Sequence, residues 1–396
     1  MGYKTIEELK KDDCTGCMAC LMSCPKSCIE KKYSNEGFWY PVIDHDQCIN
    51  CGNCYRTCPQ LSQPEYSSIK KGDICLKKDA AESTSGGAFW GMAQYLIEKK
   101  GGIVCGAIMD ETYKVKHICV DNVQDLRNMQ GSKYVQSDLE ECFAQIERYL
   151  QQGRWVLFSG TPCQGAALSN YLNNKNKDRL IIVDLVCHGV PSPAFWEKHI
   201  KGIIPEKEHG KISVKFRRKD KYDKTVYDLS FSNGKKIPAK SDLYYNLFLK
   251  GDSFRESCYV CRYATEKRAS DVTIGDCNTW LEYMHFYPET AISIVLCNTE
   301  KGIRFWDECN YLFETDKLDV EKEVRGNKQL NRPSKRREIR NRIYEEIYSL
   351  PKEELKRKYT EKLSVKDYVK FVAKHVIPVK SRESIRRMLL KNGSKR

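Results

Sequence analysis

Eight cysteines near the N-terminus fall into two runs with the same spacing. The runs are Cys14, Cys17, Cys20 and Cys24, and Cys48, Cys51, Cys54 and Cys58. In each run two residues separate successive cysteines among the first three, three residues precede the fourth, and a proline follows. Three thiolates this close together suit three corners of an iron–sulfur cubane, and this spacing is typical of bacterial [4Fe–4S] ligation. The two runs therefore predict a chain that carries electrons.

The two runs predict two clusters that exchange one ligand. In two-cluster ferredoxins the fourth cysteine of each run binds the cluster of the other run. One cluster would have the ligands Cys14, Cys17, Cys20 and Cys58, and the other Cys48, Cys51, Cys54 and Cys24. The alternative is structural zinc, but zinc sites favour two ligand pairs divided by a spacer. The spacing favours the clusters.

Four further cysteines are spread through the middle of the chain. Cys163 and Cys187 each follow an apolar segment, and Cys258 and Cys261 form a C-x-x-C pair. Ligands of α/β sheets bind at the carboxyl ends of the strands, where Cys163 and Cys187 could meet the pair. Buried cysteines also act as small hydrophobic residues. From spacing alone, a third cluster, inert core cysteines and a zinc site all stay open.

The order of the segments predicts a mixed fold, of the α+β or α/β class. Residues 1–62 are expected to form a small ferredoxin-like domain, and residues 62–73 a linker rich in serine and proline. Alternating strand and helix patterns between 74 and 330 are typical of an α/β domain. Residues 331–396 are polar and are predicted to form a basic helical tail.

Individual elements follow from the same patterns. Strands are expected at 103–109, 155–158, 180–186 and 291–297, and helices at 88–97, 138–150 and 302–313. Alternating segments at 212–216 and 226–231, followed by Asn233-Gly234, predict an antiparallel excursion from the main sheet.

The composition narrows the class of protein. With 41% hydrophobic residues among 396, the chain can bury cores for two or three domains. No signal peptide is recognisable, and no apolar stretch reaches the roughly 18 residues of a spanning helix. Twenty cysteines in such a chain indicate reduced thiols and metal sites in the cytoplasm, in an anaerobic setting.

The net charge of +14 belongs to the tail. Residues 331–396 carry 21 Lys and Arg against 8 Asp and Glu, which leaves 46 against 45 in the first 330 residues. Between 366 and 391 apolar residues are interleaved with Lys and Arg, so the tail could make peripheral contact with an anionic membrane. The alternative is a helical extension packed on the body. No recognition motif points to nucleic acid.

A series of short motifs runs from residue 83 to residue 280. They are Ser85-Gly86-Gly87-Ala88-Phe89, Gly131-Ser132-Lys133-Tyr134, Gly160-Thr161-Pro162-Cys163-Gln164, Cys187-His188-Gly189-Val190-Pro191, the pair Cys258 and Cys261, and Ser270-Asp271-Val272-Thr273-Ile274-Gly275-Asp276. In order and spacing they resemble the family of beta subunits of coenzyme F-420 hydrogenases and dehydrogenases, where F-420 is a deazaflavin. The resemblance implies a third [4Fe–4S] cluster on Cys163, Cys187, Cys258 and Cys261 beside a bound FAD.

The FAD implied by the resemblance can be matched to three segments. They are Ser85, Gly86 and Gly87; Gly131, Ser132, Lys133 and Tyr134; and Ser159, Gly160, Thr161 and Gln164. A glycine-rich turn before a helix offers free N–H groups to a pyrophosphate, although an ordinary capped helix would look the same. Lys133 could contact a charge or be a solvated surface lysine.

His188 is the candidate catalytic residue, as a proton donor, because histidine titrates near neutral pH. The alternative is a structural histidine that holds the loop after Cys187. The remaining cysteines are expected in the core, with Cys277 the one that could approach the flavin; they are Cys28, Cys75, Cys105, Cys119, Cys142, Cys277, Cys297 and Cys309.

These features predict an iron–sulfur flavoprotein oxidoreductase. Clusters pass one electron at a time and flavin handles one or two, which is the reason to combine them. Electrons would be exchanged with a protein such as a ferredoxin and would reduce or oxidise an organic substrate, which the resemblance links to surface polysaccharide biosynthesis. The alternatives are a coenzyme F-420 oxidoreductase, although no motif marks an F-420 site, and an electron-transfer module that docks a partner enzyme.

Overall fold

Four parallel strands form the centre of the structure. They are β4 (Ile103–Met109), β6 (Val156–Gly160), β7 (Leu180–Leu185) and β11 (Val272–Asp276). The computed structural model describes residues 4–77, 79, 83–173, 177–220, 223–283, 285–287, 290–361, 364, 369, 381 and 384. All five residues of β6 are buried, as expected for a parallel strand that is covered on both faces.

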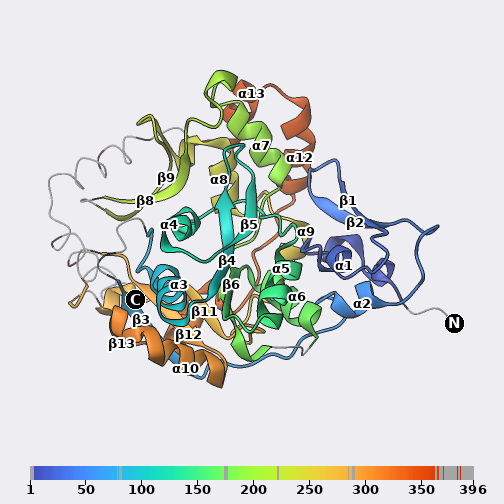
Figure 1. The fold of residues 1–396 in the computed structure, drawn as a ribbon. Coiled ribbons are helices and arrows are strands. Elements are labelled where there is room, and N and C mark those ends of the chain that lie inside the picture. Colours follow the sequence, from blue (N-terminus) through green and yellow to red (C-terminus); the bar gives the residue numbers. More distant parts are fainter. Residues whose placement is uncertain are drawn as a thin grey trace.

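Antiparallel strands extend this centre on both sides. They are β5 (Val115–Val120) next to β4, and β12 (Ser293–Cys297), β3 (Lys71–Leu76) and β13 (Glu314–Lys317) beyond β11. The complete order is β13-β3-β12-β11-β7-β6-β4-β5 (Figure 1). Because β4, β6, β7 and β11 are parallel, their carboxyl ends lie at one edge, and the candidate site is built there.

Helices cover both faces of this sheet. On one face α3 (Ala88–Lys100), α4 (Val123–Leu126) and α10 (Glu300–Cys309) share a core with Val104, Leu157 and Val183. On the other face α5 (Cys142–Gln151) and α6 (Pro162–Leu172) pack on Ile103, Phe158 and Ile182. Successive side chains of a strand thus point to opposite faces of the sheet, and because helices cover both faces, these segments are apolar throughout.

The ferredoxin-like region lies at one side of the molecule (Figure 1). It consists of the hairpin β1 (Ile29–Tyr33) and β2 (Trp39–Ile43) with the short helices α1 (Ala19–Met22) and α2 (Asn53–Thr57). Both α1 and α2 contact α6 of the body. The cysteine-rich region is therefore docked on the edge of the sheet that carries Cys163.

An aromatic core supports the outer layer of the body. It joins α7 (Pro193–Lys201), α8 (Leu243–Lys250), α12 (Ile339–Ser349) and α13 (Lys352–Tyr359) to the three-stranded sheet of β8 (Val214–Asp220), β9 (Asp223–Phe231) and β10 (Lys236–Pro238). Short helices α9 (Glu256–Tyr259) and α11 (Val320–Gly326) lie near the site. The polar segment after residue 330 thus contributes buried residues such as Ile343 and Tyr344 to the body.

The mixed α/β class is confirmed. The predicted elements differ from the structure mainly at their ends, whereas strands β3, β5, β11 and β13 were not predicted. The strand at 103–109 has the predicted bounds. The helix predicted at 138–150 begins only at Cys142, because Asp138 forms a β-bridge with Lys116. Thr299 caps α10 and moves its start to Glu300. The predicted linker 62–73 is wrong at its end, since residues 71–73 belong to strand β3 and pair with β12. The predicted antiparallel excursion is confirmed by β8 and β9.

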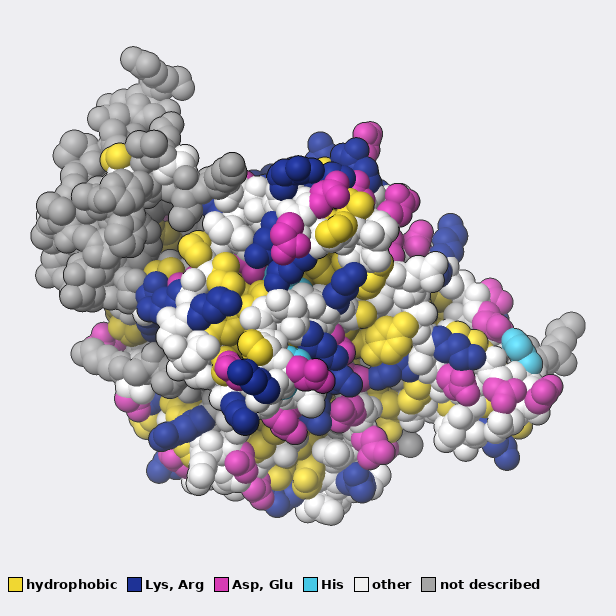
Figure 2. Space-filling model, turned by 90° about the horizontal axis from the view of Figure 1, so that it is seen from above, with side chains coloured by type: hydrophobic (Ala, Val, Ile, Leu, Met, Phe, Trp, Pro, Cys, Tyr) yellow, Lys and Arg dark blue, Asp and Glu magenta, His cyan; other side chains and the backbone are white. Residues whose placement is uncertain are grey.

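Surface charges agree with the balanced composition of the body. Figure 2 shows basic and acidic side chains interspersed over the face seen from above. In the part of the chain that the structure describes, no helix is both long and apolar enough to span a bilayer. The amphipathic segment predicted between 366 and 391 lies outside the described residues, apart from Val369, Ser381 and Ser384.

Candidate iron–sulfur and flavin site

Four cysteines from three parts of the body line one cavity. Cys163 lies in the first turn of α6, Cys187 follows β7, and Cys258 and Cys261 lie in and after α9. The cavity encloses about 760 Å³ of empty space, its open mouth included. Residues up to 98 positions apart in the sequence thus present their sulfurs to one space, as a cubane with one thiolate on each iron needs.

The electrostatics of this cavity disfavour free thiolates. Burial raises the pKa of Cys163, Cys258 and Cys261, and that of Cys187 to about 11, and neighbouring sulfurs of the group raise those of Cys163, Cys187 and Cys258 further. Bound metal takes the place of the thiol proton and supplies the missing positive charge. The donor set therefore fits a metal cluster better than four free thiols at neutral pH.

A buried cation with unused donors lies close to this cavity. Arg268 is 2% exposed, and Nε, Nη1 and Nη2 of its guanidinium have no hydrogen-bond partner among the described residues. Its nearest acid is Asp184, with 3.7 Å between Nη1 and Oδ2. The charge of Arg268 acts on the thiols of Cys187 and Cys261. Unused donors beside these cysteines fit an anionic group in the cavity.

The ferredoxin-like cysteines form two groups that match the exchanged pattern. Burial raises the pKa of Cys58 to about 12, and the sulfurs of Cys17 and Cys14, from the first run, add to this effect. Cys24 lies in the other group, in a second cavity that is also lined by Cys48, Cys51 and Cys54. Cys24 thus lies with the first three cysteines of the second run, and Cys58 lies with those of the first run. Cys28 also lines the second cavity, with its sulfur 3.4 Å from that of Cys24.

The first ferredoxin group adjoins the four-cysteine cavity. Cys17 lines that cavity together with Tyr263, which is 2% exposed. Burial raises the pKa of the Tyr263 phenol well above its ordinary range, and its neighbours Tyr66, Cys163 and Cys17 add to the shift. Tyr263 therefore lies beside cysteines of both groups. The arrangement places the two proposed clusters side by side with one aromatic ring near both.

Two of the three segments matched to FAD come together at the carboxyl edge of the sheet. Gly86 N–H donates to Ser293 Oγ at 2.8 Å, at the start of β12. The hydroxyls of Thr84 and Ser132 are 3.4 Å apart. Arg217 Nη2 donates to Thr84 O at 3.2 Å, and Arg217 Nη1 pairs with Asp276 Oδ2 at 2.9 Å. The segment between β3 and α3, the segment between the 3-10 helix η3 (Arg127–Met129) and α5, and strand β8 therefore meet at the end of β11.

This meeting point has features of an anion site. Gly87, the N-cap of α3, makes no side-chain capping bond, so the first N–H groups of α3 are not capped by a side chain. Arg217 is buried, and its Nε has no hydrogen-bond partner among the described residues. Gly131 has φ +79°, and a Cβ there would meet nothing within 4 Å. The uncapped helix, the buried cation and the open space fit a pyrophosphate.

Lys133 and Tyr134 have more specific roles than the sequence indicated. Lys133 Nζ donates to the carbonyls of Asn128, Met129 and Gln130 at 2.7–3.2 Å, and burial lowers its pKa to about 7. It holds the loop before Gly131 and is not a solvated surface lysine. The Tyr134 ring stacks on Phe248 with 4.4 Å between centroids.

The third segment matched to FAD lies at the four-cysteine cavity. Thr161 and Gln164 form the capping box of α6, and both line the cavity. Ser159 O contacts His117 Nε2 at 3.0 Å. Gly160 ends β6, where a Cβ would approach Gln164 Oε1 to 2.9 Å. This segment positions Cys163, and the structure does not bring it into direct contact with Ser85–Gly87.

His188 lies between these two regions. Its Nδ1 accepts from Gln329 Nε2 at 2.8 Å, its carbonyl accepts from Ser334 Oγ, and its ring packs edge-on against Phe248 at 5.7 Å. Burial lowers the pKa of His188, while a backbone hydrogen bond with Leu249 opposes the shift. The ring is held on both sides, which favours the structural alternative for this residue.

Another group of three cysteines lies within the sheet. Cys105 on β4 and Cys119 on β5 form a disulfide, with 4.1 Å between Cα atoms. The expectation that these residues are reduced thiols is wrong for this pair, because the antiparallel register places them directly opposite each other. The sulfurs of this pair and of Cys142 all lie within 4.8 Å of one another, close enough for a single metal ion. The other remaining cysteines are buried, as predicted.

Known proteins match both parts of this chain. Residues 153–321 match the family that comprises the C-terminal part of the beta subunits of coenzyme F-420 hydrogenase and dehydrogenase, and residues 13–61 match a 4Fe-4S dicluster domain, as do residues 40–100. Residues 153–321 therefore contain the C-terminal region of this family of beta subunits. Members of the family thus share the part of the body that holds Cys163, Cys187, Cys258 and Cys261, and here it follows a dicluster domain.

Three relatives of this chain differ in how much of their own length it matches. A subunit of the F(420)H(2) dehydrogenase of Methanosarcina mazei is 26% identical over 47% of this chain and 56% of its own length. Coenzyme F420-dependent sulfite reductase of Methanocaldococcus jannaschii is 28% identical over 41% of this chain and 26% of its own length. The VorC subunit of the ketoisovalerate oxidoreductase of Methanothermobacter marburgensis is 30% identical over 16% of this chain and 81% of its own length. The chain therefore covers about half of the length of the first relative and about a quarter of the length of the second.

Several residues at this site have no signal in the sequence. Arg255, Arg268 and Arg217 are buried cations whose partners lie far along the chain. Tyr263 is an aromatic residue two positions after Cys261, and Cys28 follows the first cysteine run by four residues. The sequence signal for Cys28 is its position close to Cys24-Pro25, which is enough to mark it as a cysteine of the cluster region.

Proposed function

We propose that this iron–sulfur oxidoreductase also binds FAD and exchanges electrons between a protein partner and an organic substrate, for which the comparisons favour coenzyme F-420. One observation carries the proposal. Four cysteines from separate parts of the body converge on a single cavity that Cys17 of the dicluster domain also lines. That arrangement would give one chain a third metal site next to the group of Cys17.

We propose Cys163, Cys187, Cys258 and Cys261 as ligands of a third [4Fe–4S] cluster. Their convergence, their raised thiol pKa values and the unused donors of Arg268 support this assignment. For the dicluster domain we propose Cys14, Cys17, Cys20 and Cys58 for one cluster, and Cys48, Cys51, Cys54 and Cys24 for the other. The position of Cys24 in the cavity of Cys48, Cys51 and Cys54, and the effect of the Cys17 and Cys14 sulfurs on Cys58, support the exchange.

FAD would be held at the end of β11. Ser85, Gly86, Gly87, Gly131 and Ser132 surround the uncapped start of α3, and Arg217 supplies the buried positive charge. A bound flavin supplies the conversion between single electrons and a hydride equivalent, which iron–sulfur clusters lack. Lys133 holds the Gly131 loop through three carbonyls, so we assign it a supporting role.

The chain's own residues would position the two cofactor regions and keep water out between them. Phe248 lies between Tyr134 on the flavin side and His188 on the cluster side, with centroid distances of 4.4 and 5.7 Å. Phe254 covers the other side of the His188 ring at 5.0 Å. We propose that His188 fixes the loop of Cys187 and does not donate the proton, since Gln329 already engages its Nδ1.

The partners remain part of the proposal. The relative in Methanosarcina mazei is named as a subunit, so we propose that this chain also works with protein partners that deliver or accept electrons at the dicluster domain. A ferredoxin is one such partner. The basic segment after residue 366 is proposed as a peripheral membrane contact, because apolar and basic residues are interleaved in it.

The proposal is tested by hydride exchange in the purified chain. Protein isolated without oxygen is given a low-potential reductant and coenzyme F-420, and the deazaflavin absorbance is followed. We expect reduction of F-420 by the wild type and by Cys309→Ser, whose cysteine is buried outside the cavity. Cys163→Ser should lose most of this activity. Turnover that survives in Cys163→Ser would contradict an electron route through the third cluster. If the wild type shows no turnover, coenzyme F-420 is not the substrate, and the alternatives are another organic substrate or an electron-transfer module without a substrate of its own.

A further inference from the structure

Arg255 is a buried cation that contacts the dicluster domain through neutral groups only. It is 0% exposed. Its Nη1 donates to Cys14 O at 3.1 Å, its Nη2 to Trp39 O at 2.7 Å, and its Nε to Gln136 Oε1 at 3.1 Å. Two of these three acceptors belong to the dicluster domain. The guanidinium thus ties the Cys14 loop to the body.

The dicluster domain is shaped around this guanidinium. The rings of Phe38 and Tyr40 lie 4.9 and 4.6 Å from Arg255 Cζ, which are cation–π distances. Gly16, with φ +68°, leaves space for it, because a Cβ there would lie 2.5 Å from Nη2. A side chain at position 16 would displace the charge, so the loop between Cys14 and Cys17 has a specific place for it.

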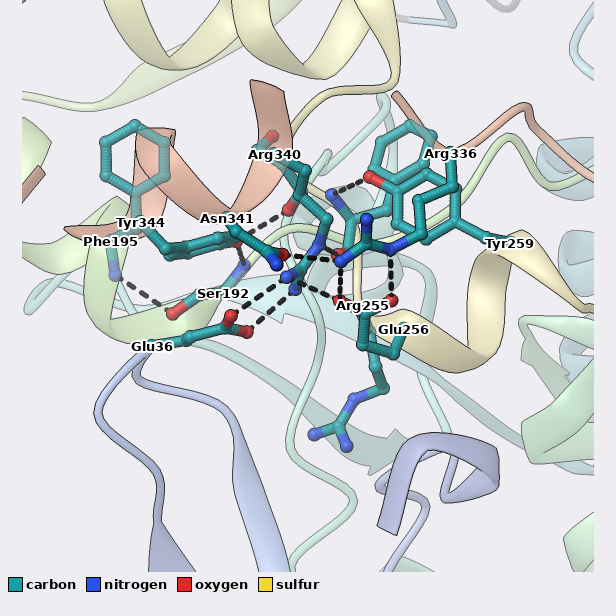
Figure 3. A network of polar contacts seen from close by, with 12 residues as sticks. Glu36, Ser192, Phe195, Arg255, Glu256, Tyr259, Arg336, Arg340, Asn341 and Tyr344 are labelled. Atoms are coloured by element: carbon teal, nitrogen blue, oxygen red, sulfur yellow. Dashed lines mark hydrogen bonds and ion pairs between the residues drawn. The ribbon is translucent and has the colours of Figure 1, made fainter. Parts of the chain in front are cut away.

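A neighbouring arginine, Arg340, has the carboxylate partners that Arg255 lacks among the described residues. Arg340 is also 0% exposed, but its Nη2 pairs with Glu36 and its Nη1 with Glu256, each at 2.7 Å. Figure 3 shows Arg340 directed at both carboxylates, whereas the Arg255 guanidinium points away from them. Among the described residues, no carboxylate lies within the 4.0 Å ion-pair distance of Arg255. One buried cation is neutralised by the chain and the other is not.

An uncompensated buried charge is costly, so a counter-charge is expected. Arg255 adjoins ligands of two different proposed clusters, because its Nη1 donates to Cys14 O at 3.1 Å and its own carbonyl accepts from Cys258 N–H at 2.9 Å. A cubane with four thiolate ligands is anionic and gains a further negative charge on reduction. Net charge around a cluster is one of the factors that set its reduction potential.

We propose that Arg255 is a positioning residue that supplies the counter-charge for the cluster of the Cys14 loop and for its neighbour at Cys258, and so raises both reduction potentials. This inference rests on the proposed ligand assignment. A cation favours the reduced, more negative cluster over the oxidised one. Placed between the two sites, it keeps both in a range where an electron can pass from one to the other.

The test is a redox titration of the full chain, purified without oxygen and followed by electron paramagnetic resonance. Arg255→Gln removes the charge and keeps a polar side chain, and Arg255→Lys keeps the charge. We expect full iron content in both variants, a shift to lower midpoint potential in Arg255→Gln, and a potential near that of the wild type in Arg255→Lys. A purely structural role would not separate these two variants.

The matched control is the double variant Glu36→Gln with Arg340→Gln. It removes a buried contact at the same interface without changing the net charge, and Glu256 keeps Arg336 as its partner. We expect no shift in potential. Equal potentials in the wild type and Arg255→Gln would overturn the inference, as would loss of iron in both Arg255 variants. If the wild type contained clusters in the dicluster domain alone, the proposed function would be contradicted. The midpoint potential of the Cys14 cluster in the Arg255 variants would still test this inference.

Discussion

At the scale of single residues, the second cavity contains one cysteine too many for one cluster. Cys24, Cys28, Cys48, Cys51 and Cys54 all line it, and a cubane takes four thiolates. Cys24 is assigned as the ligand because it occupies the fourth position of its run. Cys28 is buried and lies within sulfur contact of Cys24, so it is placed to donate a weak S–H hydrogen bond to a ligand sulfur.

Serine variants separate these two cysteines. Cys24→Ser should lower the iron content by up to about four atoms per chain, because it removes a ligand. Cys28→Ser should leave the iron content unchanged, since the hydroxyl keeps a donor at that place. Iron analysis of anaerobically purified protein measures both. The assignment is reversed if Cys28→Ser loses iron and Cys24→Ser retains it.

His117 should make stability depend on pH. Burial lowers its pKa from 6.5 to about 4 in the folded chain. Between these values the unfolded chain binds a proton that the folded chain does not, so stability falls as pH drops from about 6.5 to about 4, by at most about 3 kcal/mol. His117→Gln should reduce this slope, because the amide does not titrate.

Urea unfolding at several pH values measures this effect. The control is His45→Gln, since the His45 side chain is 67% exposed and should contribute little to folding. A slope that is the same in His117→Gln and in the wild type would show that the acid sensitivity comes from other groups.

At the scale of elements, α12 fastens the hairpin of the dicluster domain to α9. Arg340 on α12 joins Glu36, in the β1–β2 turn, to Glu256 at the start of α9 (Figure 3). Breaking a buried ion pair leaves a charge without a partner and typically costs about 3–5 kcal/mol. Because both glutamates are partly exposed, we expect Arg340→Met to destabilise the chain by about 2–3 kcal/mol.

The matched control for Arg340 is Arg325→Met. Arg325 pairs with Glu321 on α11, but the two side chains are 71% and 87% exposed. Exposed pairs contribute about 0–1 kcal/mol, so this variant should unfold close to the wild type. Chemical denaturation gives both free energies of unfolding. Equal values for the two variants would mean that α12 does not hold the hairpin in the way described.

Local sequence patterns predicted the central elements well and the edges less well. The apolar runs at 103–109 and 180–186 are predictable because the parallel strands are buried on both faces. Strand β3 was not predicted, since its first residues Lys71, Gly72 and Asp73 have no apolar pattern and the strand is held by pairing with β12. A strand that depends on a partner more than 200 residues away gives little local signal.

At the scale of the whole molecule, the dicluster domain docks against the four-cysteine cavity, as the proposed electron route requires. The four-cysteine cavity includes Thr15, Cys17 and Gln60 from that domain beside cysteines of the body. Gln136 Nε2 and Arg262 Nη1 donate across the boundary to Thr15 O and Gln60 O, at 3.2 and 2.9 Å. The fusion of two domains in one chain thus brings two cofactor regions into contact.

The proposed cysteine ligands follow from the sequence, but their surroundings do not. Spacing identified the eight N-terminal cysteines, and motif resemblance identified the four in the body, because ligand chemistry restricts those positions to cysteine. Arg255 and Arg268 are set by contacts with residues up to 241 positions away, such as Cys14. The sequence matched three segments to one FAD without showing their spacing, and the structure places Thr161 and Gln164 at the four-cysteine cavity, apart from Ser85–Gly87.

The central claim, three clusters and a flavin in one chain, is tested most directly by the iron, sulfide and flavin content after anaerobic purification. The wild type should contain about twelve irons, about twelve sulfides and one FAD. Cys258→Ser should fall to about eight irons, and Cys309→Ser should match the wild type. About eight irons and no flavin in the wild type, unchanged in Cys258→Ser, would contradict the account.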